Sequence, residues 1–154
     1  LEDVSTQRDR EIGFRQGLVA AGLSLFDRAV GNYNLDEARH AARALFDRPA
    51  DERPDAVFVA SDHMAMGVMD VLRFEFGLRV PEDVSVVGFD DVPHASAPSY
   101  RLTTLHQPVE RMVEDAVELL RERIERPALP PRQTLVPVSL VLRDSARIPE
   151  NWQS

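Results

Sequence analysis

Residues 55–93, DAVFVASDHMAMGVMDVLRFEFGLRVPEDVSVVGFDDVP, decide the fold of this chain. Residues 56–60 and 84–89 are short apolar runs rich in β-branched and aromatic side chains, which is typical of strands buried on both faces. Between them, apolar residues recur at helical spacing, at Ala65, Val68, Met69, Leu72 and Phe76. Gly77 and Pro81 predict where this helix stops. The stretch therefore predicts two parallel strands joined by a helix.

Polar residues follow both strands, Ser61-Asp62 after the first and Asp90-Asp91 after the second. A right-handed helical crossover brings the carboxyl ends of parallel strands to the same edge of the sheet. Because open α/β sheets bind ligands at that edge, we expect a site there.

Composition limits the class of protein. The chain has 154 residues, enough for one domain, and is 44% hydrophobic and 29% charged, as ordinary soluble proteins are. Its net charge of −8 argues against nucleic-acid binding by this chain itself, since that affinity rests on clustered cations. It has no Cys, which excludes disulfides, and no apolar run approaches the roughly 20 residues of a membrane helix. We expect a cytoplasmic protein without a membrane partner.

Along the chain, helical and strand patterns alternate, about four helices and five strands in all. The predicted helices cover residues 6–21, 35–46, 62–76 and 108–125, and the predicted strands cover residues 23–30, 56–60, 84–89, 102–106 and 134–142. In the first helix Ile12, Leu18 and Val19 are expected to face inward, and Asn34 with Glu37 is expected to cap the second. This alternation predicts an α/β fold in three layers, a mostly parallel sheet with helices on both faces.

The chain resembles the lactose-repressor (LacI/GalR) family of transcription regulators, in the second half of its effector-binding domain. The resemblance covers residues 5–149. It rests on five segments: RDREIGFRQG (8–17), ASDHMAMG (60–67), VPEDVSVVGFDD (80–91), LTTLHQP (102–108) and LVLRDS (140–145). The combination of the third and fourth segments is the specific part.

The resemblance implies a periplasmic-binding-protein-like fold, in which two α/β lobes close on a small ligand. Residues 5–100 and 134–149 would form the C-terminal lobe, and residues 102–131 would cross into the N-terminal lobe. The family's DNA-binding helix-turn-helix is absent from this chain, whose charged start without Met looks like the inside of a longer protein. The amphipathic helix after Pro108 would then need another cover for its apolar stripe: a swapped domain, a dimer partner or a longer parent chain.

The resemblance also suggests which residues bind the ligand. Asp90 matches the family's ligand-binding acid, although a solvated turn carboxylate is the alternative. Arg8 matches an Arg that reaches the ligand from a helix start, unless it only pairs with Asp9 or Glu11. Tyr33 lies where relatives place a stacking ring, yet a loop Tyr often serves packing alone.

Four further residues are assigned with less support from the motifs: Ser61, Asp62 and Gln107 to the ligand site and Met66 to a dimer interface. Ser61 stands where the family most often has Asn, and Asp62 beside it could serve the helix cap alone. Gln107 could touch a ligand across the hinge or be exposed to solvent. Met66 lies off the predicted inward stripe and would contribute to a dimer interface.

Other chemistry is poorly supported by the sequence. Met64, Met66 and Met69 could suggest a soft-metal site and His63 with His94 a zinc pair, but core packing explains the first set and no ligand spacing supports the second. An acid/base pair of Asp90 and Asp91 is poor geometry, because adjacent strand residues point to opposite faces. We therefore expect no metal and no cofactor.

The leading function is the effector-binding and dimerisation module of a LacI-type transcriptional regulator. In that family a small molecule, most often a sugar, shifts lobe closure and so controls operator binding. The partners would be the effector, a second copy of the chain and, through the missing helix-turn-helix, DNA. The alternative is a secreted sugar-binding protein of the same fold. An α/β enzyme is third, since we find no nucleophile elbow and no phosphate-binding Gly loop.

Overall fold

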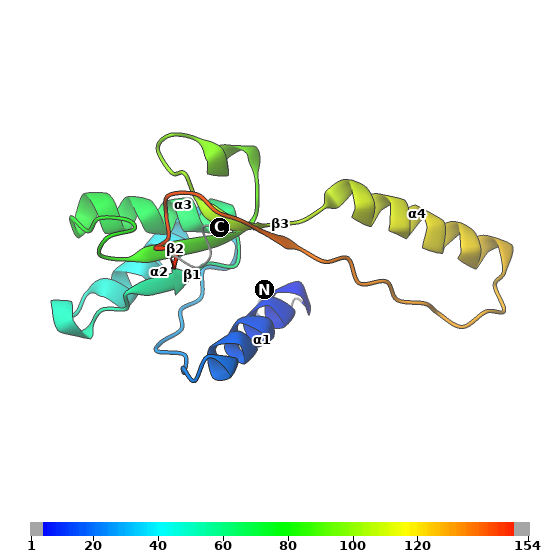
Figure 1. Ribbon diagram of the computed structural model, residues 1–154, viewed down its shortest axis with the longest axis horizontal. Coiled ribbons are helices and arrows are strands. Elements are labelled where there is room, and N and C mark those ends of the chain that lie inside the picture. The colour runs from blue at the N-terminus through cyan, green and yellow to red at the C-terminus, as the bar shows by residue number, and fades with distance from the viewer. Residues whose placement is uncertain (1–4, 150–154) are drawn as a thin grey trace.

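The computed structural model describes residues 5–149 of the chain (Figure 1). Its α-helices are α1 (Ser5–Ala20), α2 (Leu35–Phe46), α3 (Asp62–Asp70) and α4 (Val109–Glu125). Its strands are β1 (Ala56–Phe58), β2 (Ser85–Asp90), β3 (Thr103–His106) and β4 (Ser139–Val141). The four strands form one sheet in the order β1-β2-β3-β4, in which only β3 and β4 run antiparallel. The predicted α/β class with a mostly parallel sheet is confirmed.

Helices cover both faces of the sheet, which gives the predicted three layers. On one face, Val57 and Val86 pack into the core with α2 and α3. On the other face, the Phe14 ring of α1 stacks on the Phe58 ring of β1, with their centroids 4.9 Å apart. Alternate strand residues point to opposite faces, so one strand serves both layers.

The core gathers around α3. Its residues Met64 to Met69 are all buried, and Val71 and Leu72 in the π-helical turn that follows (Val71–Glu75) are also buried. Burying one such side chain contributes roughly 1.5–3 kcal/mol. The predicted stripe is therefore correct, but Met66 was wrongly placed outside it: this side chain is 7% exposed.

Helix α2 begins as its sequence predicts. The Asn34 side chain accepts hydrogen bonds from the backbone N–H groups of Asp36 and Glu37. Glu37 does not return the bond: the backbone N–H of Asn34 donates to the Gly31 carbonyl at 2.8 Å, and the Glu37 carboxylate accepts from the Asn32 amide at 2.6 Å. Ala38, Ala42 and Phe46 form the buried face.

The predicted strand over residues 23–30 is wrong. This segment makes no strand pairing, and Leu23 and Phe26 are about three-fifths exposed. A groove of about 460 Å³ is lined by this segment together with α1, α2 and β1. The inward face of α1 also differs from expectation: Leu18 lines this groove, whereas Ile12 and Val19 are exposed.

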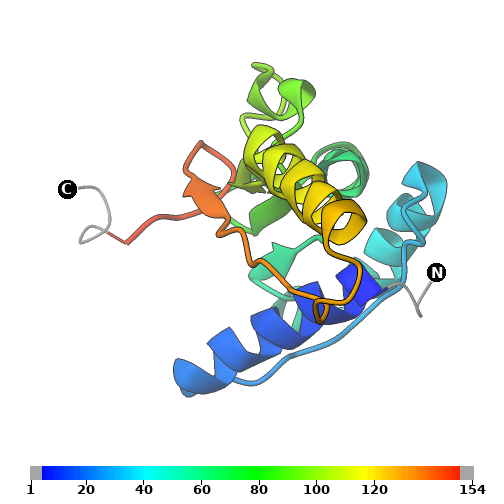
Figure 2. The same ribbon diagram turned by 90° about the vertical axis from the view of Figure 1, so that its right-hand side faces the viewer.

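Helix α4 stands away from the sheet, and residues 126–138 return from it to β4 (Figures 1 and 2). Its amphipathic pattern is confirmed, and its apolar stripe is exposed. The exposed members are Val109, Met112, Val113, Val117, Leu120 and Ile124. Of the predicted strand over 134–142, only β4 forms. Within residues 5–149, no helix combines the length and apolar character needed to cross a membrane.

Candidate functional site

Three elements meet at the Asp90 carboxylate, at the carboxyl end of β2. Gln107, which follows β3, donates from Nε2 to Asp90 Oδ1 at 2.7 Å. Arg10 of α1 places Nη2 3.2 Å from the same oxygen. The predicted edge of the sheet thus gathers one acid, one amide and one guanidinium.

Arg10 is held in place by two further contacts. Its Nη1 donates to the Ala60 carbonyl, just beyond β1, at 2.5 Å, and its Cζ lies 3.8 Å from the centre of the Phe89 ring. Phe14, four residues later on the same face of α1, stacks on the sheet. The guanidinium is therefore fixed by packing as well as by charge.

The structure brings Arg10, and not Arg8, to Asp90. Side chains two residues apart on a helix differ by about 200° in direction, so these two arginines point away from each other. The side chain of Arg8 is exposed and makes no hydrogen bond or ion pair with any of residues 5–149. The spacing of Arg10 and Phe14 is the sequence signal that would have identified the inward arginine.

Asp90 has an unfavourable environment for a carboxylate. Burial raises the pKa of Asp90 above its usual value, and this effect outweighs the opposing charge of Arg10. The neighbouring Asp62 raises the pKa of Asp90 further. Because strained or desolvated charges gather at functional sites, this marks Asp90 as a candidate ligand group.

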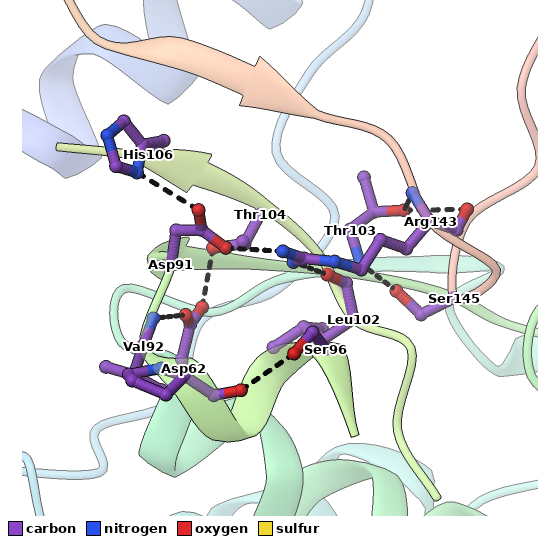
Figure 3. Close-up of polar contacts among 11 residues, drawn as sticks. Asp62, Asp91, Val92, Ser96, Leu102, Thr103, Thr104, His106, Arg143 and Ser145 are labelled. Carbon is purple, nitrogen blue, oxygen red and sulfur yellow. Dashed lines mark hydrogen bonds and ion pairs between the residues drawn. The ribbon is translucent and has the colours of Figure 1, made fainter. Parts of the chain in front are cut away.

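Asp91 faces a different set of partners, so the two acids do not converge. Its Oδ1 accepts from Arg143 Nη2 at 2.7 Å, and its Oδ2 lies 3.0 Å from His106 Nδ1 (Figure 3). Burial alone would raise the pKa of Asp91, but the hydrogen bond and charge of Arg143, with help from His106, lower it. Asp91 thus ties the ends of β2, β3 and β4 together, a structural role whose partners the sequence did not reveal.

Ser61 and Asp62 lie at the same edge but are buried. Ser61 occupies the N-cap position of α3, 5% exposed, and its side chain makes no capping hydrogen bond. Asp62 is fully buried and accepts hydrogen bonds from Thr104 and from the backbone of Val92. Its partner Thr104 was not anticipated from the sequence.

Tyr33, which was also predicted to contact the ligand, lies apart from the Asp90 cluster. Tyr33 is 38% exposed on the loop before α2, and within residues 5–149 no hydrogen bond or ring contact joins it to Asp90, Arg10 or Gln107. Its stacking role stays a prediction. Met66, being 7% exposed, offers little surface to a dimer partner.

Comparison with known proteins agrees with this arrangement. Residues 1–146 match the family model of the periplasmic binding protein-like domain. The ribose operon repressor of Escherichia coli (strain K12) is 36% identical over 146 residues, which are 94% of this chain and 43% of the repressor. The HTH-type transcriptional repressor PurR of Vibrio vulnificus (strain CMCP6) is 38% identical over 142 residues, which are 91% of this chain and 42% of PurR.

A solved structure extends the likeness to three dimensions. The complex of the transcriptional regulator CelR with cellobiose superposes with a TM-score of 0.85 at 36% identity, covering 95% of this chain and 44% of CelR. The chain spans less than half the length of the relatives it matches. The chain therefore belongs to the LacI/GalR family of transcription regulators, within its periplasmic-binding-protein-like effector-binding domain.

Proposed function

We propose that the chain is the effector-binding and dimerisation module of a LacI-type regulator, and that its effector is a sugar bound at Asp90. The observation that supports this most is the meeting of Asp90, Arg10 and Gln107 at one strand end. The cellobiose bound by CelR supports the ligand class.

The chemistry of the cluster suits a neutral polyhydroxyl ligand. A carboxylate accepts hydrogen bonds from two hydroxyl groups, and charged hydrogen bonds contribute roughly 1.5–3 kcal/mol each. A guanidinium donates in a planar fork to the hydroxyl oxygens. Because Arg10 already balances the charge of Asp90, a neutral ligand leaves no charge unpaired when the site closes.

The rest of the proposal follows the resemblance. Residues 5–100 and 134–149 form the C-terminal lobe, and residues 102–131 cross to a second lobe that covers α4. Ligand binding then changes lobe closure in a cytoplasmic dimer, and operator DNA is bound by a separate part of the protein. Tyr33 remains a proposed ligand contact at the rim, whereas Arg8 points away from the Asp90 cluster.

Thermal shift with a panel of sugars tests the site. In a chain that binds cellobiose, D-ribose or another sugar of the panel, Asp90→Asn abolishes the shift while the unliganded melting temperature stays within about 2 °C. Asn suits the test because it matches Asp in size and shape and removes only the charge, so the side-chain bulk at this position, where φ is 124°, stays the same. The matched control is Asp144→Asn, an exposed acid paired with Arg101, which leaves the shift intact.

Two outcomes contradict the proposal. An undiminished shift in Asp90→Asn removes Asp90 from the site. A longer protein that binds the sugar tightly and shows no change in operator affinity on binding is a solute-binding protein, and the regulator assignment is then wrong.

A further inference from the structure

The Asp90-Asp91 turn has a backbone conformation that side-chain-bearing residues rarely adopt. The φ angles are 124° at Asp90 and 58° at Asp91. Such conformations are strained, and they persist only when the surroundings determine them. A specific contact must therefore hold this turn.

Asp62 makes that contact from inside the protein. Its Oδ2 accepts from the backbone N–H of Val92 at 2.9 Å, directly after the turn. Its Oδ1 accepts from Thr104 Oγ1 of β3 at 2.6 Å (Figure 3). One carboxylate thus closes the turn and anchors it to the neighbouring strand.

The sheet leaves room for this carboxylate at one glycine. A Cβ added to Gly88 would meet Asp62 Oδ1 at 2.2 Å and Leu102 Cδ2 at 2.9 Å. Any other residue at position 88 would displace the Asp62 side chain. Gly88, Asp62 and Thr104 therefore fit together as one arrangement.

The arrangement carries an electrostatic cost. Asp62 is fully buried, in the first turn of α3, where the helix dipole favours an anion. Yet its charge also lies near enough to Asp90 to oppose the ionisation of that residue. A neutral side chain would avoid this repulsion. The contribution of Asp62 must therefore come from the two hydrogen bonds that its carboxylate accepts.

We propose that Asp62 is a positioning residue, whose buried carboxylate fixes the Asp90-Asp91 turn and so directs the Asp90 carboxylate toward Arg10, Gln107 and the ligand. The ligand part of this proposal rests on the function proposed above. Asp62 does not touch the ligand, because it is fully buried. The groups facing Asp90 are Arg10 from α1, Asp62 from α3 and Gln107 after β3, whereas His106 and Arg143 face Asp91.

The test compares Asp62→Ala with Asp62→Asn in the whole chain. The Asn side chain can still accept from Val92 through its oxygen and donate to Thr104 through its nitrogen. Ala can do neither. If geometry is what Asp62 supplies, Asp62→Ala weakens binding of the panel sugar by at least tenfold, and Asp62→Asn stays within about threefold of the original chain.

A measurement without ligand separates this proposal from the proposed function. Nuclear magnetic resonance gives the exchange rate of the Val92 amide proton and the φ-dependent couplings of Asp90 and Asp91. We expect Asp62→Ala to accelerate Val92 exchange at least tenfold and to shift both couplings, and Asp62→Asn to preserve them. Ser61→Ala, next to Asp62 but with no side-chain capping bond, is the control that changes neither.

The two measurements distinguish failure of the sugar function from failure of the positioning role. If no sugar binds the original chain but Asp62→Ala changes the turn, the sugar function fails and the positioning role stands. If Asp62→Ala leaves the turn unchanged, or if Ala and Asn weaken binding equally, the positioning role is overturned. Should Asp62→Ala not fold, Thr104→Val removes one of the two bonds and keeps the charge, and unchanged couplings there overturn the proposal.

Discussion

Helices α3 and α4 both have strong apolar faces, but only one of these faces is covered. Leu72, in the π-helical turn after α3, is fully buried, whereas Leu120 of α4 is 62% exposed. The segment that returns from α4 contacts the helix through polar groups: Arg132 pairs with Glu122 at 3.2 Å and Arg123 donates to the Leu129 carbonyl. The pattern of a helix thus fixes which face is apolar, and the neighbouring elements decide whether that face contributes to stability.

The largest effect on stability is expected in the core beside α3. Leu72→Ala leaves a cavity in the core beside α3 and lowers the free energy of unfolding by roughly 2–5 kcal/mol. Leu120→Ala, the matched change in α4, alters it by about 0.5 kcal/mol or less. Urea unfolding followed by circular dichroism measures both. Equal losses in the two variants would mean that the face of α4 is covered in solution.

A change at a glycine extends the comparison to the backbone of the sheet. Gly88→Ala forces a methyl group against Asp62 and Leu102, and overpacking of this kind costs roughly 1–3 kcal/mol. A Cβ added to Gly13 in α1 would meet no heavy atom of residues 5–149 within 4 Å beyond its own stretch of helix, so Gly13→Ala is the control. There the better helix propensity of Ala adds about 0.5–1 kcal/mol of stability. A stable Gly88→Ala variant would show that Asp62 can move aside.

The next effect compares two helix starts. Asn34 accepts two backbone N–H groups at the start of α2, whereas Ser61 at the start of α3 makes no side-chain capping bond. Asn34→Ala should therefore cost about 1 kcal/mol, and Ser61→Ala a few tenths at most. Thermal unfolding of the two variants measures the difference. A larger loss for Ser61→Ala would reveal a hydrogen bond that forms in solution.

The sequence predicted the elements that local patterns determine. Residues 35–46 form the predicted helix, and the two strands around α3 lie where the apolar runs placed them. The segment 23–30 also has a largely apolar sequence, yet it forms no strand, because a strand needs a hydrogen-bonding partner and this segment does not pair with the edge of β1. Pairing is a tertiary property that periodicity does not report.

The sequence predicted where the candidate site lies, but it did not predict all of the residues that form it. The crossover rule put Asp62 and Asp90 at one edge of the sheet, and the hydrogen bond of Asp62 to Val92 confirms that proximity. The choice between Arg8 and Arg10 depends on the rotation of α1 against the sheet, which is set by the stacking of Phe14 on Phe58. Partners distant in sequence, such as Arg143 for Asp91, left no local pattern to detect.

The smallest expected effect is on the pH dependence of stability. It differs in sign between an exposed ion pair on the surface and the acid of the candidate site. Hydrogen bonds from the side chain and the backbone N–H of Arg79 lower the pKa of Asp83 to about 2, below the ordinary 3.8. The ionised form is therefore favoured in the folded chain, so this contribution to stability is complete above about pH 4 and disappears as the pH falls toward about 2. The pKa of Asp90 is shifted in the opposite direction. Because this pKa is raised, ionisation of Asp90 opposes folding, and protonation in acid removes that penalty.

Urea unfolding between about pH 2 and 6 should show both signs. The original chain is more stable than Asp83→Asn at about pH 5, and the difference vanishes near pH 2 and shrinks in high salt, because the pair with Arg79 is exposed. Asp90→Asn is at least as stable as the original chain at about pH 6, and that advantage declines as acid protonates Asp90. A loss of stability in Asp90→Asn at that pH would mean that Arg10 and Gln107 compensate fully for the burial of the carboxylate. Asp90 would then stabilise the fold as Asp83 does in its pair with Arg79, and its energetics would not mark it as a ligand-binding group.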